Sequence, residues 1–594
     1  MSAIQLTLNL LFYTPHAALW PHTAPEAYLA RALSELGHEI SYLTCGKAQT
    51  YCSPMTASGL QPGCKDNESA DVCSSCKAAA NAISRIYGFS VSTLAQYLSN
   101  EDYSRIDQLA ENSIESKSLD TEHLGVNVGR VALYELTLAH KKMSTVLSAL
   151  QWSEYRCYLT NALRTLQGFA HYLEKNTHDA ILCFSPQYSN NNSAMQYAIN
   201  MGVKVLFLES GTNIAHRLGT MRVWDWKVHK LVNPGLTYWR GSELSQVTPY
   251  SARMVTRHFR QLINGQHFAV YSTPHKECGL VRKRWNIRQE QKIILMTLSS
   301  YDEAYAALLI EGFPAKKVFS KVFRTQAEWI KATTEWMETR PDLFLVIRVH
   351  PRDFPNKRDA LRSEQSYILE DLLKHTPDNV YVNWPEENIS LYDILEDVEA
   401  VLTGWSVTAM EALVLGIPVV TYDAELPSYP SDIHYTGNSK REYFLNIDRA
   451  LTDGWRLENA INGFRWLAYS FVTCTITVSE TFGSFEFRRQ FWLNRFIRRI
   501  SRRFKPLYYM LDLLDWKAAR PGALNISDML MMGYDALPQA RITYGTPNQN
   551  DDRDIILEEL SCLHKLIFSG ERFATDRRGL SANILKELNK WRQI

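Results

Sequence analysis

The stretch LVIRVHPRDFP (345–355), followed by VYVNWPEENISLYDILEDVEAVLTGWSVTAMEALVLGIPVVTYD (380–423), decides the fold of this chain. Short apolar runs alternate here with helical stretches, which is the rhythm of parallel βαβ units. The runs predicted as strands are 343–349, 400–402 and 418–422. Polar turns follow the first two, and ligands of open parallel sheets bind at the carboxyl ends of strands. We therefore predict an α/β fold with a site for a phosphorylated ligand, a nucleotide, at these turns.

The turn residues have the chemistry that a phosphate needs when no metal is present. Negative charge is then stabilised by hydroxyls, a His or Arg and free backbone N–H groups. Ser406 and Thr408 open a helix predicted over 408–415, where the first N–H groups are unpaired. His350 ends a strand, and Pro351 restricts its backbone to extended conformations. Further candidates at strand ends are Arg348, Ser299 and Ser300.

Each of these residues also has a structural explanation. Ser406 is a good N-cap residue whether or not it binds a ligand. Glu411 in the first turn of the same helix would offset the helix dipole. Arg348 would serve in an ion pair, and Ser299 and Ser300 are ordinary turn residues.

Composition describes a folded protein of two or three domains. The 594 residues are 45% hydrophobic and 21% charged, and the formal net charge is +1. No zinc-finger or RNA-binding aromatic motif is present, so nucleic acid is not an expected partner. The N-terminal residues carry no basic leader or cleavage site and are expected to form a buried strand. No apolar run is long enough to span a bilayer, so we expect a cytoplasmic protein.

A cluster of cysteines suggests a structural metal site. Five of the ten cysteines fall within one short stretch, namely Cys45, Cys52, Cys64, Cys73 and Cys76. The last two form a C-x-x-C pair, and thiolates chelate zinc well. Their spacing matches no known zinc module. Bound zinc, an iron–sulfur centre and loop thiols without metal therefore stay open, with disulfides as a further alternative.

Three parts follow one another along the chain. Residues 1–275 form a Rossmann-like domain, with strands predicted at 4–13, 40–44, 179–184 and 203–208, a helix at 26–36 and a cysteine-rich loop at 45–76. Residues 285–455 form a second Rossmann-like domain that opens with a strand at 292–298 and a helix at 326–339. Residues 456–594 form a mainly helical extension. No G-x-G-x-x-G fingerprint is present, so a dinucleotide cofactor is not expected.

Residues 290–425 resemble bacterial capsule and surface-polysaccharide biosynthesis proteins, glycosyltransferases of the GT-B fold. Three motifs carry the resemblance: TLSSYDE at 297–303, R-x-H-P at 348–351 and S-x(4)-E-A…G-x-P-V-V at 406–420. Similar His-Pro and Ser/Thr pairings occur in bacterial sialyltransferases, Kdo transferases and CDP-glycerol polymerases. The resemblance implies two domains that face a cleft, with His350 and the hydroxyls on the donor's phosphate and Glu411 on its ribose. Many relatives have Gly soon after the Ser, whereas this chain has Val407-Thr408.

The resemblance also implies a reaction. A sugar would move from a nucleotide donor, such as a CMP-linked acid, onto a glycan or lipid-linked acceptor of capsule or lipopolysaccharide type. The transfer would be inverting and would need no cofactor for its chemistry. Alternatives are a CDP-alditol phosphotransferase, an enzyme similar to UDP-GlcNAc 2-epimerases, and a non-catalytic scaffold of polysaccharide assembly.

An inverting transferase needs a base in the N-terminal domain to deprotonate the acceptor hydroxyl. Glu209, in the loop predicted after Leu208, is the first candidate, and Glu209-Ser210-Gly211 is similar to the acidic element of bacterial sialyltransferases. Glu26 and His16 follow, with His22 and His216 as weaker candidates. Glu26 at the start of its predicted helix would otherwise complement the helix dipole.

One basic segment points to a membrane surface. Residues 488–505, RRQFWLNRFIRRISRRFK, hold seven Arg, one Lys and no acid, with apolar residues at helical spacing. A basic amphipathic helix of this kind suits anionic headgroups, which would make the protein peripheral on the inner membrane. The alternative is a basic helix packed on an acidic patch of the same protein.

Overall fold

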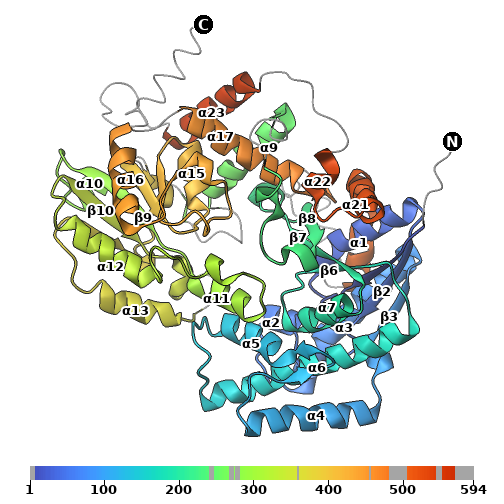
Figure 1. The fold of residues 1–594 in the computed structure, drawn as a ribbon. Coiled ribbons are helices and arrows are strands. Elements are labelled where there is room, and N and C mark those ends of the chain that lie inside the picture. The colour runs from blue at the N-terminus through green and yellow to red at the C-terminus, as the bar shows by residue number, and fades with distance from the viewer. Residues whose placement is uncertain are drawn as a thin grey trace.

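The computed structural model describes residues 7–239, 246–265, 273–274, 281–356, 360–395, 397–453, 457–480, 505–542 and 552–568. Two α/β domains lie side by side, one on the right and one on the left of Figure 1. The C-terminal helices run along the top of both domains.

The N-terminal domain is built on a seven-stranded sheet in the order β15-β8-β7-β6-β1-β2-β3. Strands β7, β6, β1, β2 and β3 are parallel to one another. At one edge β8 is antiparallel to β7, and β15 is antiparallel to β8. The strands are β1 Asn9–Tyr13, β2 Glu39–Thr44, β3 Ser90–Thr93, β6 Ala180–Phe184, β7 Lys204–Ser210, β8 Thr220–Asp225 and β15 Ile476–Thr477. A separate two-stranded hairpin joins β4 Glu122–His123 to β5 Val126–Asn127.

Helices cover both faces of this sheet. One face packs against α1 and α3, and the other against α6 and α7. A further cluster beneath α6 joins α4 and α5. The helices are α1 Trp20–Glu35, α2 Ser53–Ala57, α3 Asp66–Tyr87, α4 Asn100–Glu115, α5 Val128–Ala139, α6 Ala149–Lys175, α7 Ser189–Asn200 and α8 Trp226–His229.

The second domain has a fully parallel six-stranded sheet in the order β11-β10-β9-β12-β13-β14. Its strands are β9 Lys292–Thr297, β10 Leu343–Arg348, β11 Val380–Asn383, β12 Val398–Thr403, β13 Val419–Thr421 and β14 Tyr435–Thr436. Its helices are α10 Val281–Arg284, α11 Tyr301–Leu309, α12 Gln326–Met337, α13 Glu364–Leu372, α14 Leu391–Leu395, α15 Thr408–Val414 and α16 Lys440–Asp453.

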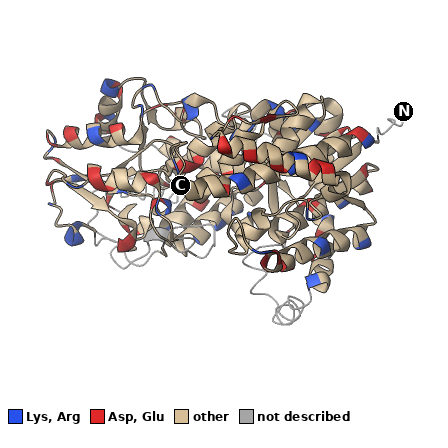
Figure 2. Cartoon of the chain, turned by 90° about the horizontal axis from the view of Figure 1, so that it is seen from below, with Lys and Arg blue, Asp and Glu red and all other residues tan. Residues whose placement is uncertain are grey.

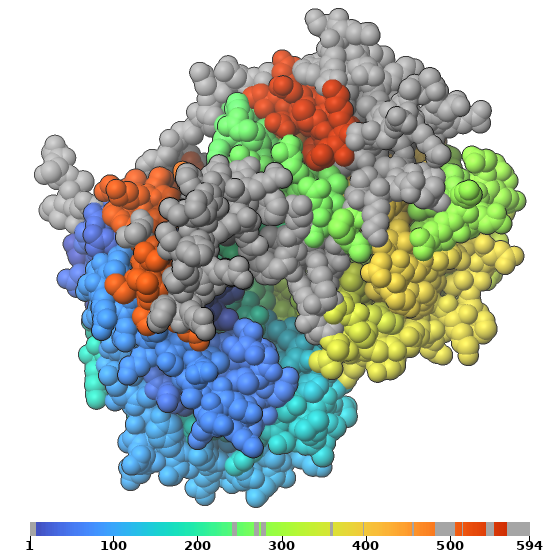
Figure 3. Space-filling model, turned by 180° about the vertical axis from the view of Figure 1, so that it is seen from behind, coloured from blue at the N-terminus to red at the C-terminus, as the bar shows by residue number. Residues whose placement is uncertain are grey.

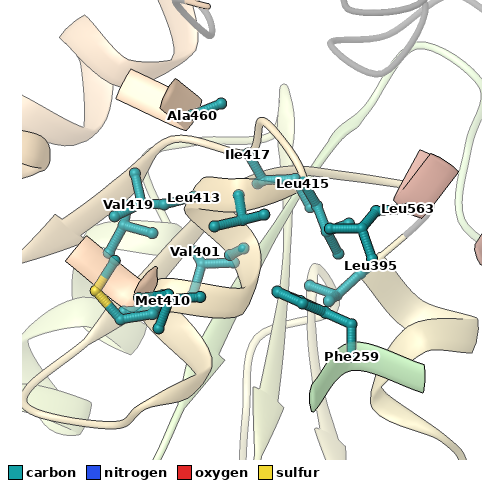
Figure 4. Close-up of a cluster of buried hydrophobic side chains, with 14 of the residues drawn as sticks. Phe259, Leu395, Val401, Met410, Leu413, Leu415, Ile417, Val419, Ala460 and Leu563 are labelled. Carbon is teal, nitrogen blue, oxygen red and sulfur yellow. The ribbon is translucent and has the colours of Figure 1, made fainter. Parts of the chain in front are cut away.

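Alternate residues of this sheet enter two cores. Ile294 and Met296 face α12 and α16, whereas Ile293 and Leu295 face a larger cluster on the other side. That cluster is sealed by α9 Pro249–Ile263, α17 Leu457–Ala468 and α23 Arg553–Phe568. Figure 4 shows Phe259, Ala460 and Leu563 of these helices around α15 and Val401. Helix α9 comes before the second domain in sequence and nevertheless packs into its core.

The C-terminal part belongs to both domains. After α17, strand β15 joins the first sheet, and α20 Lys505–Asp512, α21 Arg520–Met532 and α22 Leu537–Ile542 pack on that domain. Helix α23 then returns to the second domain beside α9. The extension is therefore mainly helical, as predicted, and it also supplies a strand.

The predicted α/β class, with two Rossmann-like domains and a helical C-terminal region, is confirmed. Two local predictions are wrong. Helix α1 begins at Trp20, six residues before the predicted start, because Pro25 lies inside the helix instead of marking its boundary. Much of the predicted loop at 45–76 is helical, and the C-x-x-C pair lies in α3. The basic segment 488–505 lies outside the described residues except for Lys505.

Charge is mixed over the surface. Figure 2 shows Lys and Arg interspersed with Asp and Glu over both domains. Within the described ranges, no helix combines the length and the apolar character needed to cross a bilayer.

Candidate functional site

His350 lies at the carboxyl end of β10, on a turn held by hydrogen bonds and an ion pair. Its Nδ1 accepts a hydrogen bond of 3.2 Å from the backbone N–H of Arg352, and Pro351 opens a short 3-10 turn. The guanidinium of Arg352 donates to the buried carboxylate of Asp302 at 2.6 Å (Nη2) and 3.0 Å (Nε). This ion pair joins the ends of β9 and β10, so the His-Pro turn is held in place with the His350 side chain partly exposed.

Ser406 and Thr408 follow strand β12, which is separated from β10 by β9 in the sheet. The Ser406 hydroxyl accepts a hydrogen bond of 3.3 Å from the Thr408 N–H, while the Ser406 N–H donates to Thr403 Oγ1 at 3.2 Å. Both side chains are partly exposed, and Val407 between them is 73% exposed. The N-cap of α15 is Val407 and not Ser406 as predicted, but the Ser406 hydroxyl still accepts from the first helical N–H and stays accessible.

Glu411 of α15 and Arg348 of β10 lie close enough for the charge of each to affect the pKa of the other. Tyr392 donates to Glu411 Oε2 at 2.6 Å, and burial raises the pKa of Glu411 to about 7 against the opposing effect of Arg348. Arg348 donates to Asn383 Oδ1 at 2.7 Å and to the Ile389 carbonyl at 3.0 Å. Burial lowers the pKa of Arg348 to about 10. Arg348 therefore has a structural role in joining β10 to the segment after β11.

Ser299 and Ser300 follow β9 and are both buried. The Ser299 N–H donates to Gln326 Oε1 at 2.9 Å, and Gln326 Nε2 donates to the Ser299 carbonyl at 3.1 Å. Its hydroxyl has no hydrogen-bond partner, which is unusual for a buried polar atom. Ser300 precedes α11, and its hydroxyl lies 3.5 Å from Glu303.

Glu209 lies within β7, near its end, and not in the loop predicted after Leu208. Its carboxylate is partly exposed and accepts a hydrogen bond of 3.3 Å from the Ser185 hydroxyl at the end of β6. Arg222 of β8 is its partner in the sheet register. Burial lowers the pKa of Arg222, and the charge of Glu209 opposes that shift.

Glu26 is fully buried in α1, so the predicted first-turn position is wrong. His16 Nε2 lies 3.3 Å from Glu26 Oε2 in an orientation that makes no hydrogen bond, and Thr14 donates weakly to the same oxygen at 3.4 Å. Burial raises the pKa of Glu26, and His16 opposes this shift. Burial, with the charges of His16 and Arg217, lowers the pKa of His22 to about 3, so this ring is neutral. Glu26 lies behind His16 and cannot itself touch a substrate.

His216 was also a predicted candidate. It ends a short 3-10 turn, Ile214–His216, and its Nε2 lies 3.5 Å from Arg257 Nη1 of α9.

The sequence prediction missed a polar group at the end of β6. Ser185 has a left-handed backbone with φ of +50°, a conformation whose strain is typical of functional sites. Asn190 is buried with both amide atoms unpartnered, and Gln187 Oε1 and Asn191 Oδ1 are also unpartnered. The signal in the sequence was the run SPQYSNNNS at 185–193, whose polar residues fall at a predicted strand end.

Residues of the two domains come together around Tyr188. Burial and then the carboxylates of Glu209, Glu135 and Glu303 raise the pKa of this phenol, while Arg352 lowers it. Glu209 belongs to the first sheet, whereas Glu303 and Arg352 belong to the second domain. The structure therefore brings the strand ends with Glu209 to the same place as the turn next to His350.

A buried linker fixes this arrangement. The ammonium of Lys141 donates to the carbonyls of Arg352 and Leu361, at 2.7 Å each. Glu364 accepts from Lys142 Nζ at 2.5 Å and from the Met143 N–H at 2.7 Å. Helices α5 and α11 pack on each other beside this linker, as Figure 1 shows at the centre of the molecule.

The cysteines as arranged do not fit a metal centre. All five are free thiols, and no group of three or more His, Cys, Asp or Glu among the described residues could hold an ion. Burial raises the pKa of Cys45 and Cys52 and that of Cys76 to about 12. Cys76 Sγ instead accepts from the Ala18 N–H at 3.2 Å. Zinc or an iron–sulfur centre remains an untested prediction that this geometry does not support.

No family model matches the chain, and no curated protein matches it. Solved structures similar to it include KpsC of Thermosulfurimonas dismutans, a β-Kdo 2,4 transferase, at 15% identity and a TM-score of 0.30 over 51% of this chain and 82% of that one. A putative UDP-N-acetylglucosamine 2-epimerase of Listeria monocytogenes has 11% identity and a TM-score of 0.25, over 84% of this chain and 97% of that one. The calicheamicin glycosyltransferase CalG4 has 13% identity and a TM-score of 0.24, over 79% and 95%. The two Rossmann-like domains of this chain are established by its own sheets and helices.

Proposed function

We propose that this chain is a glycosyltransferase that moves a sugar from a nucleotide donor onto a glycan or lipid-linked acceptor. One observation carries the proposal. The charges of Glu209, at the end of β7 in the first domain, and of Arg352, in the His-Pro turn of the second domain, both act on Tyr188. A base and a phosphate-binding turn are the parts that group transfer from a nucleotide sugar needs.

In this proposal the second domain holds the donor. His350, Ser406 and Thr408 would bind the leaving phosphate, since their side chains are partly exposed at the carboxyl ends of β10 and β12, on either side of β9. The buried Ser299 hydroxyl has no partner and is available to a phosphate oxygen. Glu411 would take a ribose hydroxyl with the carboxylate oxygen that Tyr392 does not occupy. Arg348 would act indirectly, by holding the end of β10.

The first domain would supply the base. Glu209 takes the proton of the acceptor hydroxyl, the acceptor oxygen attacks the anomeric carbon, and the bond from that carbon to the phosphate oxygen breaks. The electron pair leaves with the nucleotide, and attack from the opposite face inverts the anomeric configuration. Ser185 would position Glu209 through its hydrogen bond, and His16, which lies next to the buried Glu26 carboxylate, would lie on the acceptor side.

Nucleotide binding tests the donor half of the proposal. Thermal unfolding is measured with CMP, CDP, UDP and GDP, and stabilisation by CMP or CDP is the expected result, since a bound ligand raises the melting temperature. Stabilisation by UDP alone would favour a reaction of the 2-epimerase kind. No response to any nucleotide would favour a non-catalytic scaffold and overturn the proposal.

A substitution tests the phosphate assignment. His350→Ala should lower the response to the nucleotide and reduce transfer by about a hundredfold or more, since one positioned charge-stabilising group contributes on this scale. His375→Ala removes an exposed imidazole of the same domain and should change neither. Full activity of His350→Ala would remove His350 from the site.

A further inference from the structure

The outer face of the C-terminal helices has an unusual composition. We use "outer face" for the exposed residues between positions 505 and 533, which are Lys505, Pro506, Leu507, Leu511, Lys517, Arg520, Pro521, Leu524, Met531, Met532 and Gly533. All of them are basic, apolar, Pro or Gly, and no acid is exposed along this described stretch. In Figure 3 orange residues of the extension lie at the surface beside the blue N-terminal helices.

The acids of the same stretch are turned inward. Asp512 is buried and accepts from Trp20 Nε1 at 3.0 Å, and Asp515 accepts from the Ser479 hydroxyl. Asp528 is partly buried. Two of the three carboxylates are therefore bound inside the fold, while Lys517 and Arg520 are exposed and Lys505 donates to Ser75 Oγ at 2.5 Å.

The apolar residues of the outer face are not part of the core. Leu507 and Leu511 are 50% and 41% exposed, and their i,i+4 spacing places them on one side of α20. Leu524, Met531 and Met532 are 52%, 39% and 59% exposed on α21. The inner sides of both helices are already buried against α1 and α3, through residues such as Tyr509 and Ile526. Five large apolar side chains thus remain in water on two neighbouring helices.

We propose that the outer face binds the surface of an anionic lipid bilayer. Leu and Met side chains gain free energy on entering the interfacial layer, while Lys and Arg are attracted to acidic headgroups. The sequence continues the pattern, since residues 488–504, which directly precede this stretch, hold seven Arg and no acid. A soluble polyanion would satisfy the charges and leave the five apolar side chains exposed. A bilayer satisfies both, and it would bring the enzyme to lipid-linked acceptors. The inference does not depend on the proposed function.

Vesicle binding of the full chain tests this surface. Co-sedimentation is measured with vesicles of phosphatidylglycerol and phosphatidylethanolamine and with vesicles of pure phosphatidylcholine, at low and high salt. The expected result is binding to the anionic vesicles that weakens as salt rises. Equal binding to both kinds of vesicle, or to neither, would overturn the proposal.

Variants of the outer face and a control pair elsewhere distinguish specific binding through this face from nonspecific adsorption to vesicles. Leu507→Glu with Leu511→Glu, and Lys517→Glu with Arg520→Glu, should each weaken binding to anionic vesicles by about tenfold or more. The control is Val146→Glu with Leu150→Glu, at the start of α6. These side chains are 77% and 66% exposed but do not belong to the outer face, so the change should leave binding unchanged. Circular dichroism establishes that each variant is folded.

A competing occupant gives a different pattern of results. If the charges serve a soluble polyanion, heparin should bind the wild type and the Leu507→Glu, Leu511→Glu variant equally, and vesicles should bind neither. That outcome, or a loss of vesicle binding in the Val146→Glu, Leu150→Glu control equal to that in the α20 variant, would exclude a bilayer-facing role for this surface.

Discussion

At the scale of single residues, Glu411 makes a stability prediction with a definite sign. Its folded pKa of about 7 lies above the ordinary value because the carboxyl is buried. Below pH 4.5 the group is protonated in both states. Between pH 4.5 and 7 the unfolded chain releases the proton more readily, so the folded state loses stability as the pH rises through this window. Glu411→Gln cannot ionise and should avoid that loss.

The expected difference is on the order of 2–3 kcal/mol. Urea unfolding at pH 5 and pH 8 should therefore show Glu411→Gln gaining stability over the wild type by about this amount at the higher pH. Glu386→Gln makes the same chemical change at an exposed position and is the matched control. A difference that stays constant with pH would mean that Glu411 is ionised throughout.

The residues at the site could be predicted only in part. The strand-end rule placed His350 and Ser406 just after strands, since chain order alone decides which residues follow a strand, whereas Glu209 lies inside β7, one residue before its end. It could not foresee that Glu26 lies buried behind His16, because that depends on where α1 begins and how it packs. Nor could it identify Asn190, whose importance comes from having no partner in a buried position.

At the scale of elements, Gly129 of α5 permits a close approach between that helix and the backbone of residues 119–121. A Cβ added there would lie 2.4 Å from the Leu119 carbonyl oxygen and 2.6 Å from the Thr121 nitrogen. These atoms belong to backbone and cannot rotate away, so Gly129→Ala must push α5 from the 119–121 segment. We expect a loss of about 2–4 kcal/mol in the free energy of unfolding.

Gly463 of α17 provides the matched control, since it is also a helical glycine. Its added Cβ would meet only side chains at 3.4 Å or more, which is ordinary contact. Gly463→Ala should therefore be neutral or stabilise the protein by up to about 1 kcal/mol through helix propensity. Denaturant unfolding measures the change in the free energy of unfolding for both variants. Equal changes would show that the close backbone approach at Gly129 does not destabilise the Ala variant.

Elements were predictable in proportion to how strongly their own sequence specifies them. Strands β6, β9 and β10 are continuous apolar runs in the middle of parallel sheets, and their predicted bounds differ from the observed ones by one residue at most. The short edge strands β14 and β15 were missed, because two residues carry no periodic pattern and pair only when the rest of the fold presents an edge.

At the scale of the whole molecule, the C-terminal part ties the domains into one unit. It adds β15, α21 and α22 to the first domain and α23 to the second, and the linker at Lys141–Met143 holds the two together from the other side. Such cross-packing could not be read from the sequence, where residues after 456 appeared only as a helical tail. It implies that the domains do not unfold independently.

Leu563 of α23 tests this coupling. It is fully buried among Phe259, Leu395 and Leu415 of the second domain (Figure 4). Leu563→Ala should cost about 2–5 kcal/mol by leaving a cavity. If the domains are coupled, calorimetry should show one transition that moves to lower temperature as a whole. Cys562→Ala changes an exposed neighbour on the same helix and should not move it. Two transitions, of which only one moves, would show that each domain unfolds alone and that the extension does not couple them.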